Sequence, residues 1–161
     1  KASNKLYSSS LIKIKVMQET ITNQVIKQGV SMQLNNDSNN CTVLALAATT
    51  GSSYDEAYVH AERYWLRKKK KGVRTKTLDA YFTKTLGVSK MGTKKVYHIK
   101  HSNKEVVCKM TVGTFAKEYP IGNHYVLVSG HALAINDGKI LDHANLLLKP
   151  KRIVKHAWKI K

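Results

Sequence analysis

Cys41, His131 and Asp142 are the residues whose types and order could perform nucleophilic chemistry. A cysteine reacts as its thiolate, and both a helix N-terminus and a nearby imidazolium lower the pKa of a thiol. Cys41 stands where the polar run NNDSNN gives way to the apolar run TVLALAA, in the first turn of an expected helix. Because such pairs meet in space rather than in sequence, the imidazole must come from elsewhere in the chain. An inert small core residue is the alternative interpretation of Cys41.

His131 is the strongest candidate among the seven histidines. It begins a predicted strand between two small residues that let another side chain approach, and Asp142 lies on the next predicted strand. If Asp-Gly forms a two-residue type I′ turn, Asp142 lies diagonally beside His131 on one face, about 7 Å away between backbones and within hydrogen-bonding reach. A bulged Asn-Asp-Gly turn is the competing prediction. It would turn Asp142 to the opposite face and place His143 across from His131, an arrangement typical of packing or, weakly, of a metal pair.

The elements that must position these residues indicate an α+β domain, with helices first and antiparallel strands later. Helices are expected after NNDSNN, after Ser53, over TLDAYFTKTLG and over TVGTFAKEYPIGN, and strands over YVLVSG, HALAI and KILDHA. KKVYHIKHSNKEVVCKM is expected to be exposed strand and loop. We expect a single domain over residues 1–161, with residues 1–33 and the basic tail 149–161 peripheral. Within that tail, Trp158 is expected to anchor the chain to the core rather than to stack on a base.

The composition excludes several classes of protein. The chain has only two cysteines, Cys41 and Cys108, so it is neither a disulfide scaffold nor a four-cysteine zinc protein. Its apolar runs stop well short of the roughly 18 residues of a membrane span, which predicts a soluble protein. No secretory leader is visible, and the first residue is Lys1, so we expect a processed product or a trimmed piece of open location. No cofactor is expected, and His98-x-x-His101 lacks the partners of a metal site.

The charge balance favours anionic partners. The chain carries 28 Lys and Arg against 10 Asp and Glu, a formal net charge of +18. Such a surplus attracts nucleic acid, an anionic membrane surface or an acidic protein. Most of it is lysine, which predicts non-specific phosphate attraction rather than base reading, and a plain solvated surface is the alternative. The nucleic-acid candidates are the tail and the block Lys68, Lys69, Lys70 and Lys71.

Three blocks of the chain resemble papain-like cysteine peptidases of the small type found in bacteriophages and bacteria. They are NNCTVLALAATTGSSYDEAY, KGVRTKTLDAYFTKTLG and MTVGTFAKEYPIGNHYVLVSGHALAINDGKILDHA, and together they cover roughly residues 35 to 145. The last block is the most specific. It presents, in one order, a Thr-containing helix start, a Pro-Gly turn, a strand, and Gly-His-Ala leading to Asp-Gly and a further Asp.

The resemblance implies a fold and the roles of its residues. N-terminal helices carrying the cysteine would pack on a C-terminal antiparallel sheet carrying the histidine and the aspartate. Cys41 would be the nucleophile, His131 the general base and Asp142 the residue that orients the imidazole. Papain-like enzymes often carry a side-chain amide six residues before the nucleophile to bind the oxyanion, a spacing held here by Asn35, while the N–H of Cys41 supplies a second donor. The rivals of Asn35 for this role are the other asparagines of the same run, Asn36, Asn39 and Asn40.

The implied reaction is acyl transfer from a protein or peptide substrate, at a peptide or isopeptide bond. The same site on the same fold can serve a deubiquitinase, a peptidoglycan amidase or a transglutaminase-like enzyme, so the fold does not name the substrate. The alternative function is a basic, nucleic-acid-associated virion protein that uses an inactive papain-like fold as a scaffold. Both expectations are compatible with a processed phage or mobile-element protein that is packaged with DNA and delivered into a host cytoplasm.

Overall fold

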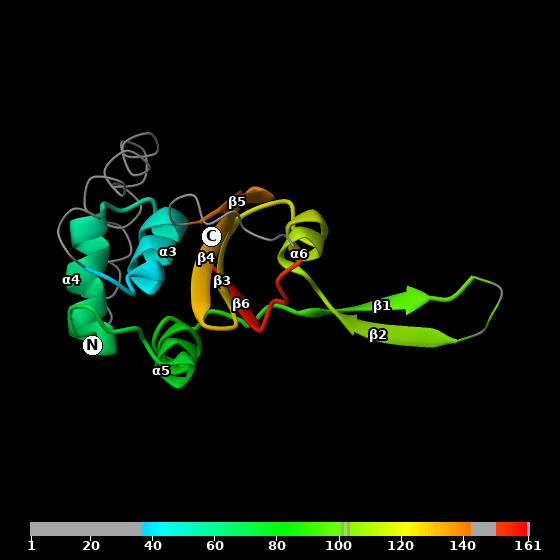
Figure 1. Ribbon diagram of the computed structural model, residues 1–161, viewed down its shortest axis with the longest axis horizontal. Coiled ribbons are helices and arrows are strands. Elements are labelled where there is room, and N and C mark those ends of the chain that lie inside the picture. Colours follow the sequence, from blue (N-terminus) through cyan, green and yellow to red (C-terminus); the bar gives the residue numbers. More distant parts are fainter. Residues whose placement is uncertain (1–36, 101, 103, 143–150, 161) are drawn as a thin grey trace, which may run out of the picture.

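The computed structural model describes residues 37–100, 102, 104–142 and 151–160. Within these ranges, helices and a four-stranded antiparallel sheet form a body from which a two-stranded hairpin projects (Figure 1). The helices are α3 (Cys41–Thr50), α4 (Tyr54–Trp65), α5 (Thr75–Ala80), which runs on into the π-helical turn η2 (Tyr81–Thr85), and α6 (Val112–Glu118). The α+β class is confirmed. No helix in the described ranges has the length and apolar character needed to span a bilayer.

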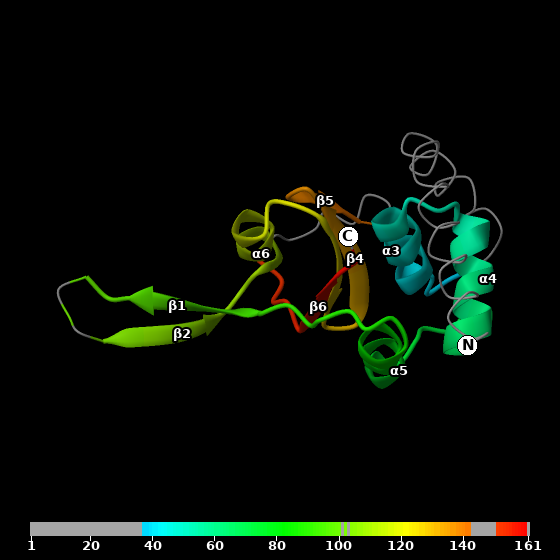
Figure 2. The same ribbon diagram turned by 180° about the vertical axis from the view of Figure 1, so that it is seen from behind.

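The main sheet lies between two layers of helices. Its strand order is β5-β4-β3-β6, and every neighbouring pair is antiparallel. The strands are β3 (Asn123–Val128), β4 (His131–Asn136), β5 (Lys139–Leu141) and β6 (His156–Lys159). Helices α3 and α5 lie on one side of the sheet, with α4 outside α3, and α6 lies on the other side, as the view from behind also shows (Figure 2).

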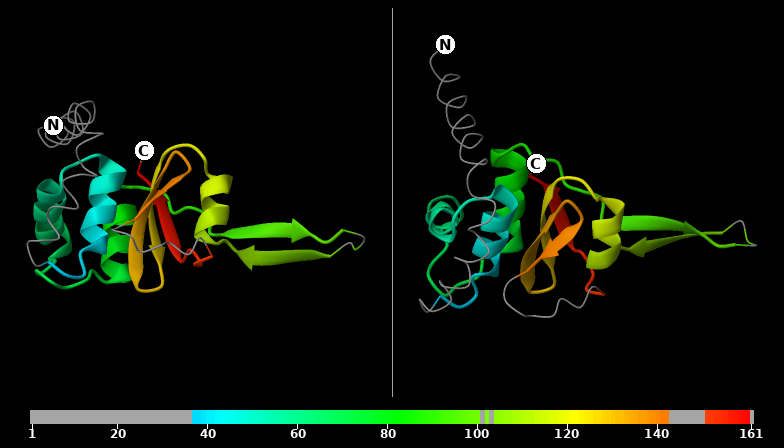
Figure 3. Two further views of the ribbon diagram at one scale, coloured as in Figure 1. Left: turned by 45° about the horizontal axis from the view of Figure 1, so that its top comes forward. Right: turned by 90° about the horizontal axis from the view of Figure 1, so that it is seen from above.

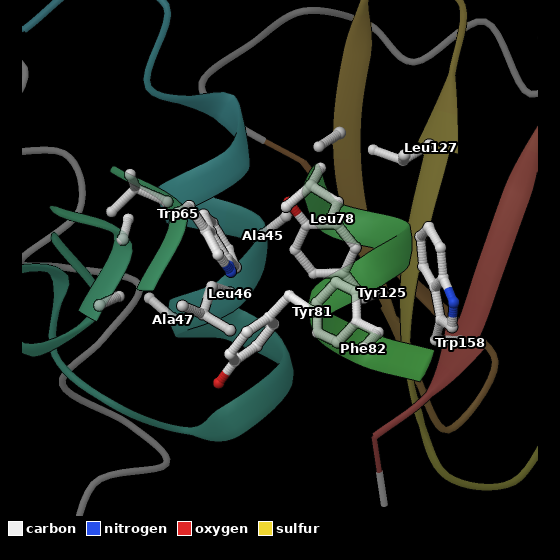
Figure 4. Packing of buried hydrophobic residues seen from close by; sticks show 14 of the residues in the cluster. Ala45, Leu46, Ala47, Trp65, Leu78, Tyr81, Phe82, Tyr125, Leu127 and Trp158 are labelled. Carbon is white, nitrogen blue, oxygen red and sulfur yellow. The ribbon is translucent and has the colours of Figure 1, made fainter. Parts of the chain in front are cut away.

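Each face of the sheet has its own apolar core, because successive strand residues point to opposite faces. On the side of α3, the rings of Phe82, Tyr125 and Trp158 are fully buried and pack against one another (Figure 4). The centroid of Phe82 lies 4.8 Å from that of Tyr125 and 5.0 Å from that of Trp158. On the side of α6, Phe115 packs with a second set of strand residues, Val126, Val128, Leu133 and Ile135.

Helix α3 is tied to the sheet at its C-terminal end. Its run of alanines and leucine favours a helix, and it ends at Gly51, whose φ of 71° is the left-handed conformation that glycine adopts most easily. The last carbonyls of a helix lack partners within it. Here the side-chain amide of Asn136 donates to the oxygen of Ala48 at 2.8 Å, and that of Asn123 donates to the oxygen of Thr49 at 3.0 Å. The two outer residues of the β3–β4 pair therefore fix the position of the helix.

Helix α4 begins as the sequence predicts. The hydroxyl of Ser53 accepts from the N–H of Glu56, and the carboxylate of Glu56 accepts from the N–H of Ser53 at 2.8 Å, which together form a capping box. The helix ends at Trp65, after which Leu66 adopts a left-handed φ of 52°. This reversal directs the chain into the connection between α4 and α5.

The prediction that the C-terminal tail is peripheral is wrong. Its described part contains β6, which pairs with β3 so that Trp158 lies opposite Tyr125. Trp158 is fully buried, which confirms its anchoring role. The abundance of lysine conceals the alternation of this strand, which places Ala157 in the core beside α6 and Trp158 in the core beside α3. Residues 1–33, also expected to be peripheral, lie outside the described residues.

A second sheet consists of the hairpin β1 (Lys94–His98) and β2 (Glu105–Lys109), which extends away from the body (Figure 3). Exposed strand and loop were expected here, and the strands are exposed along nearly their whole length. Cys108 lies in β2 and is exposed. An ion pair between Lys95 and Glu118 links the hairpin to α6.

Replacing Trp158 by alanine should destabilise the protein by about 3–5 kcal/mol, because it removes a fully buried indole from the centre of one core. Urea unfolding followed by far-UV circular dichroism measures the change. The control is Val107→Ala in the hairpin, where the side chain is 59 % exposed and the expected change is within about 0.5 kcal/mol. Equal, small effects of both substitutions would contradict an integral β6.

Candidate active site

The β4–β5 hairpin has the two-residue turn that the sequence favours. Asn136 lies opposite Lys139 and Ala134 opposite Leu141, so the loop consists of Asp137 and Gly138 alone. Both turn residues have positive φ, 47° and 73°, as a type I′ turn requires. The bulged alternative is therefore wrong, and its partner for His131, His143, lies outside the described residues.

This register brings His131 and Asp142 together. His131 is the first residue of β4, and Asp142 follows directly after β5 on the neighbouring strand. The Nε2–H of His131 donates to Oδ1 of Asp142 at 2.6 Å. The two side chains are only 10 % and 8 % exposed, so water competes little for this hydrogen bond. The aspartate thus holds the imidazole in one orientation.

Cys41 is the first residue of α3, and its thiol lies beside the imidazole of His131, which acts to lower the pKa of the thiol. Since Nε2 is engaged by Asp142, Nδ1 is the ring nitrogen left to face the sulfur. The hydroxyl of Tyr125 donates to the oxygen of Thr42 at 3.1 Å and so ties the first turn of α3 to β3. The helix and the two strands therefore bring together the three residues predicted from the sequence, Cys41, His131 and Asp142.

The electrostatics of the site favour an ion pair of thiolate and imidazolium. Burial by itself would raise the pKa of Cys41, but hydrogen bonds from His131 and from the N–H groups of Ala132 and Thr42 outweigh burial and lower it. Hydrogen bonds to Asp142 and Cys41 raise the pKa of His131 to about 9, against the opposing effect of burial. At neutral pH the imidazole is protonated, and the sulfur beside it is stabilised as thiolate.

The oxyanion donors are only partly within the described residues. Asn35, the predicted side-chain donor, and its rival Asn36 lie outside them. The amide of Asn39 donates to the oxygen of Lys70 at 3.2 Å. The side chain of Asn40 does not cap α3, and it instead opposes the rise in the pKa of the Tyr54 hydroxyl. The N–H of Cys41 belongs to the first turn of α3, where helical hydrogen bonding leaves donors available for an oxyanion.

A buried network that the sequence did not reveal holds the segment before Cys41. The carboxylate of Asp37 accepts from Tyr54 at 2.7 Å, from Arg67 at 3.0 Å and from the N–H of Lys70 at 2.7 Å. Burial raises the pKa of Asp37, and these hydrogen bonds more than reverse that rise. Arg67 directly precedes the exposed block of lysines, yet its own side chain is fully buried. The one available signal was that Asp37 is the only acid of the run NNDSNN.

Metal chemistry has no visible basis in the described residues. Within residues 37–100, 102, 104–142 and 151–160, no group of three or more His, Cys, Asp or Glu side chains is placed to hold an ion.

Comparisons with protein-family models, with curated proteins and with solved structures return no match. The function of this chain is therefore inferred from the geometry of this site.

The imidazole of His131 should titrate at about pH 9, because its protonated form is bound by Asp142 and Cys41. Asp142→Asn removes the largest cause of the raised pKa, so the midpoint should fall. Proton NMR of the imidazole, assigned by the signal lost in His131→Gln, measures both midpoints. Asp79→Asn is the matched control, because that carboxylate pairs with Lys90 at 2.7 Å instead. An unchanged midpoint in Asp142→Asn would refute the role of the 2.6 Å hydrogen bond.

Proposed function

We propose that this chain is a papain-like thiol hydrolase, a cysteine peptidase or isopeptidase, with Cys41 as nucleophile, His131 as general acid and base, and Asp142 as the residue that orients the imidazole. The observation that carries the proposal is the 2.6 Å hydrogen bond between His131 and Asp142, on an imidazole that also lowers the pKa of the Cys41 thiol. A buried cysteine that only filled space would require neither partner.

The architecture supports the same proposal. The cysteine opens a helix that packs on an antiparallel sheet, and the histidine and the aspartate come from two neighbouring strands of that sheet. This is the arrangement that the resemblance to papain-like enzymes implies. Each group is positioned by a different element, so the constellation does not follow from a single local motif.

The proposed reaction proceeds through a thioester. The thiolate of Cys41 attacks the carbonyl carbon of an amide, and the carbonyl electrons move to oxygen, where the N–H of Cys41 and the amide of Asn35 would donate. As the C–N bond breaks, the Nδ1–H of His131 gives its proton to the departing amine. Neutral His131 then takes a proton from water, which attacks the thioester. Cleavage of the C–S bond releases the acid and restores the thiolate.

A peptide vinyl sulfone, which alkylates activated cysteines, tests this proposal. It should label the wild type at Cys41, fail to label Cys41→Ala at that position, and label His131→Ala about 100-fold more slowly, since a positioned base contributes about 10²–10⁴ in rate. Cys108→Ser is the matched control, because Cys108 is the exposed second thiol and should not affect labelling. Peptide mapping by mass spectrometry identifies the alkylated residue. Equal labelling rates in wild type and His131→Ala would refute the proposal.

Non-specific nucleic-acid binding is a second candidate function, favoured by the net charge of +18 and by one exposed block. Lys68, Lys69, Lys70 and Lys71 are all exposed in the connection after α4. The described part of the C-terminal tail adds exposed cations at Lys151, Arg152, Lys155 and Lys159. This binding is compatible with hydrolysis, because a protein can carry both activities on different surfaces.

Binding to duplex DNA should weaken steeply as salt rises, because each phosphate contact releases about 0.9 counterion. Replacing Lys68, Lys69, Lys70 and Lys71 by glutamine should reduce the slope of log affinity against log salt by about 3 to 4 if all of them contact phosphates. Fluorescence anisotropy over a salt series measures the slope. Lys84→Gln on η2 is a control for one exposed charge elsewhere, expected to have little effect. Absent or salt-independent binding would remove this candidate.

A further inference from the structure

The connection between α4 and α5 forms an open pocket on the surface. Its cavity volume is about 340 Å³, and its lining runs from Trp65 to Thr77. Four of the residues that line it are cationic, Arg67, Lys68, Lys71 and Arg74, and none is acidic. A concave surface that gathers charges of one sign strengthens the local potential, so this pocket attracts an anionic group.

Two buried side chains of the pocket lining have donors without acceptors. Trp65 and Arg67 are each 4 % exposed. Within the described part of the chain, Nε1 of Trp65 and both Nε and Nη1 of Arg67 have no hydrogen-bond partner, while Nη2 of Arg67 donates to Asp37. Buried donors are nearly always satisfied in folded proteins, and an unsatisfied one costs about 1–3 kcal/mol. These donor atoms are enclosed, so the groups that an anion in the pocket would meet are the exposed cations Lys68, Lys71 and Arg74.

The pocket adjoins the segment that leads to the nucleophile. The N–H of Lys70 donates to Asp37 at 2.7 Å, and the oxygen of Lys70 accepts from Asn39, which precedes Cys41 by two positions. The connection and the segment before α3 therefore lie side by side, along the same end of the molecule as the start of α3 (Figure 3). A group held in the pocket can accordingly belong to a chain that is bound at the sulfur.

We propose that this pocket is a specificity subsite that binds the carboxylate of an aspartate or glutamate side chain in the protein substrate. The inference rests on the proposed hydrolase function, because that function makes the occupant part of a polypeptide. Arg74 is exposed at the pocket and can bind a carboxylate through paired N–H donors, whereas Nη2 of Arg67 is already bound to Asp37. The nearby lysines add attraction without demanding one geometry. The cavity, at about 340 Å³, is large enough for one acidic side chain with accompanying water.

The pocket divides the basic block into two parts. Lys68 and Lys71 line it, whereas Lys69 and Lys70 do not. A lysine outside the pocket is therefore available as a control for one inside it, because both are exposed and lie in the same short segment. The pocket variant is Lys71→Gln with Arg74→Gln. The control is Lys69→Gln with Lys76→Gln, which removes two positive charges from exposed positions outside the pocket lining.

The test uses tetrapeptide vinyl sulfones that differ only in whether glutamate, glutamine or lysine occupies each scanned position. At one position, glutamate should increase the labelling rate of Cys41 about tenfold over glutamine, a difference of about 1.4 kcal/mol. The pocket variant should lose this preference, and the control should keep it. No preference for glutamate, or equal loss in both variants, would overturn the proposal.

Binding to Cys41→Ala separates failure of the pocket from failure of the hydrolase. If no vinyl sulfone labels Cys41, the proposed function fails, and calorimetry with glutamate tetrapeptides that lack the reactive group still decides about the pocket. Binding that the pocket variant loses and the control retains supports the carboxylate subsite. Absence of such binding overturns it. The carboxylate subsite is also overturned if inorganic phosphate or an oligonucleotide binds through the pocket residues while the glutamate peptide does not bind.

Discussion

The docking of α3 on the β3–β4 pair is the contact on which the rest of the site depends. Two strand asparagines bind the last carbonyls of the helix, and Tyr125 binds its first turn, so the helix cannot slide along the sheet. Because Cys41 is the first residue of this helix and His131 the first residue of β4, fixing the helix also fixes the distance between sulfur and imidazole. The ring cluster of Phe82, Tyr125 and Trp158 packs on the same face of the sheet as the helix (Figure 4).

The electrostatic design of the site follows from burial combined with complementary charge. A partly buried thiol is ordinarily harder to ionise, and here N–H donors and an imidazolium reverse that tendency. The imidazolium is in turn stabilised by Asp142, whose side chain is nearly as buried as its own. Each charge therefore has a partner within hydrogen-bonding distance, which is the condition under which buried ions are tolerated. The same network favours the thiolate and orients the imidazole.

The cationic side chains of the protein lie in two kinds of environment. Most cations are exposed, but Arg67 is buried against Asp37 and forms part of the wall of a pocket. The carboxylate of Asp37, in the run before Cys41, therefore organises part of the lysine-rich connection after α4. The network joins the connection after α4 to the segment before α3. Charge composition alone predicts attraction to anions, whereas this network shows that one of the cations is already paired inside the protein.

The sequence by itself determined the local helices and turns, and it determined on which face of the β4–β5 hairpin Asp142 lies. The capping box at Ser53, the helix that starts at Cys41 and the type I′ turn at Asp137 and Gly138 are specified by residues close in the chain, and the turn's even length places Asp142 beside His131. Only the tertiary structure decided which strand completes the sheet and which charges are buried. Trp158 reaches the core because β6 pairs with β3, and Arg67 meets Asp37 across thirty positions of sequence. Such contacts depend on how distant elements pack, and no local pattern encodes that packing.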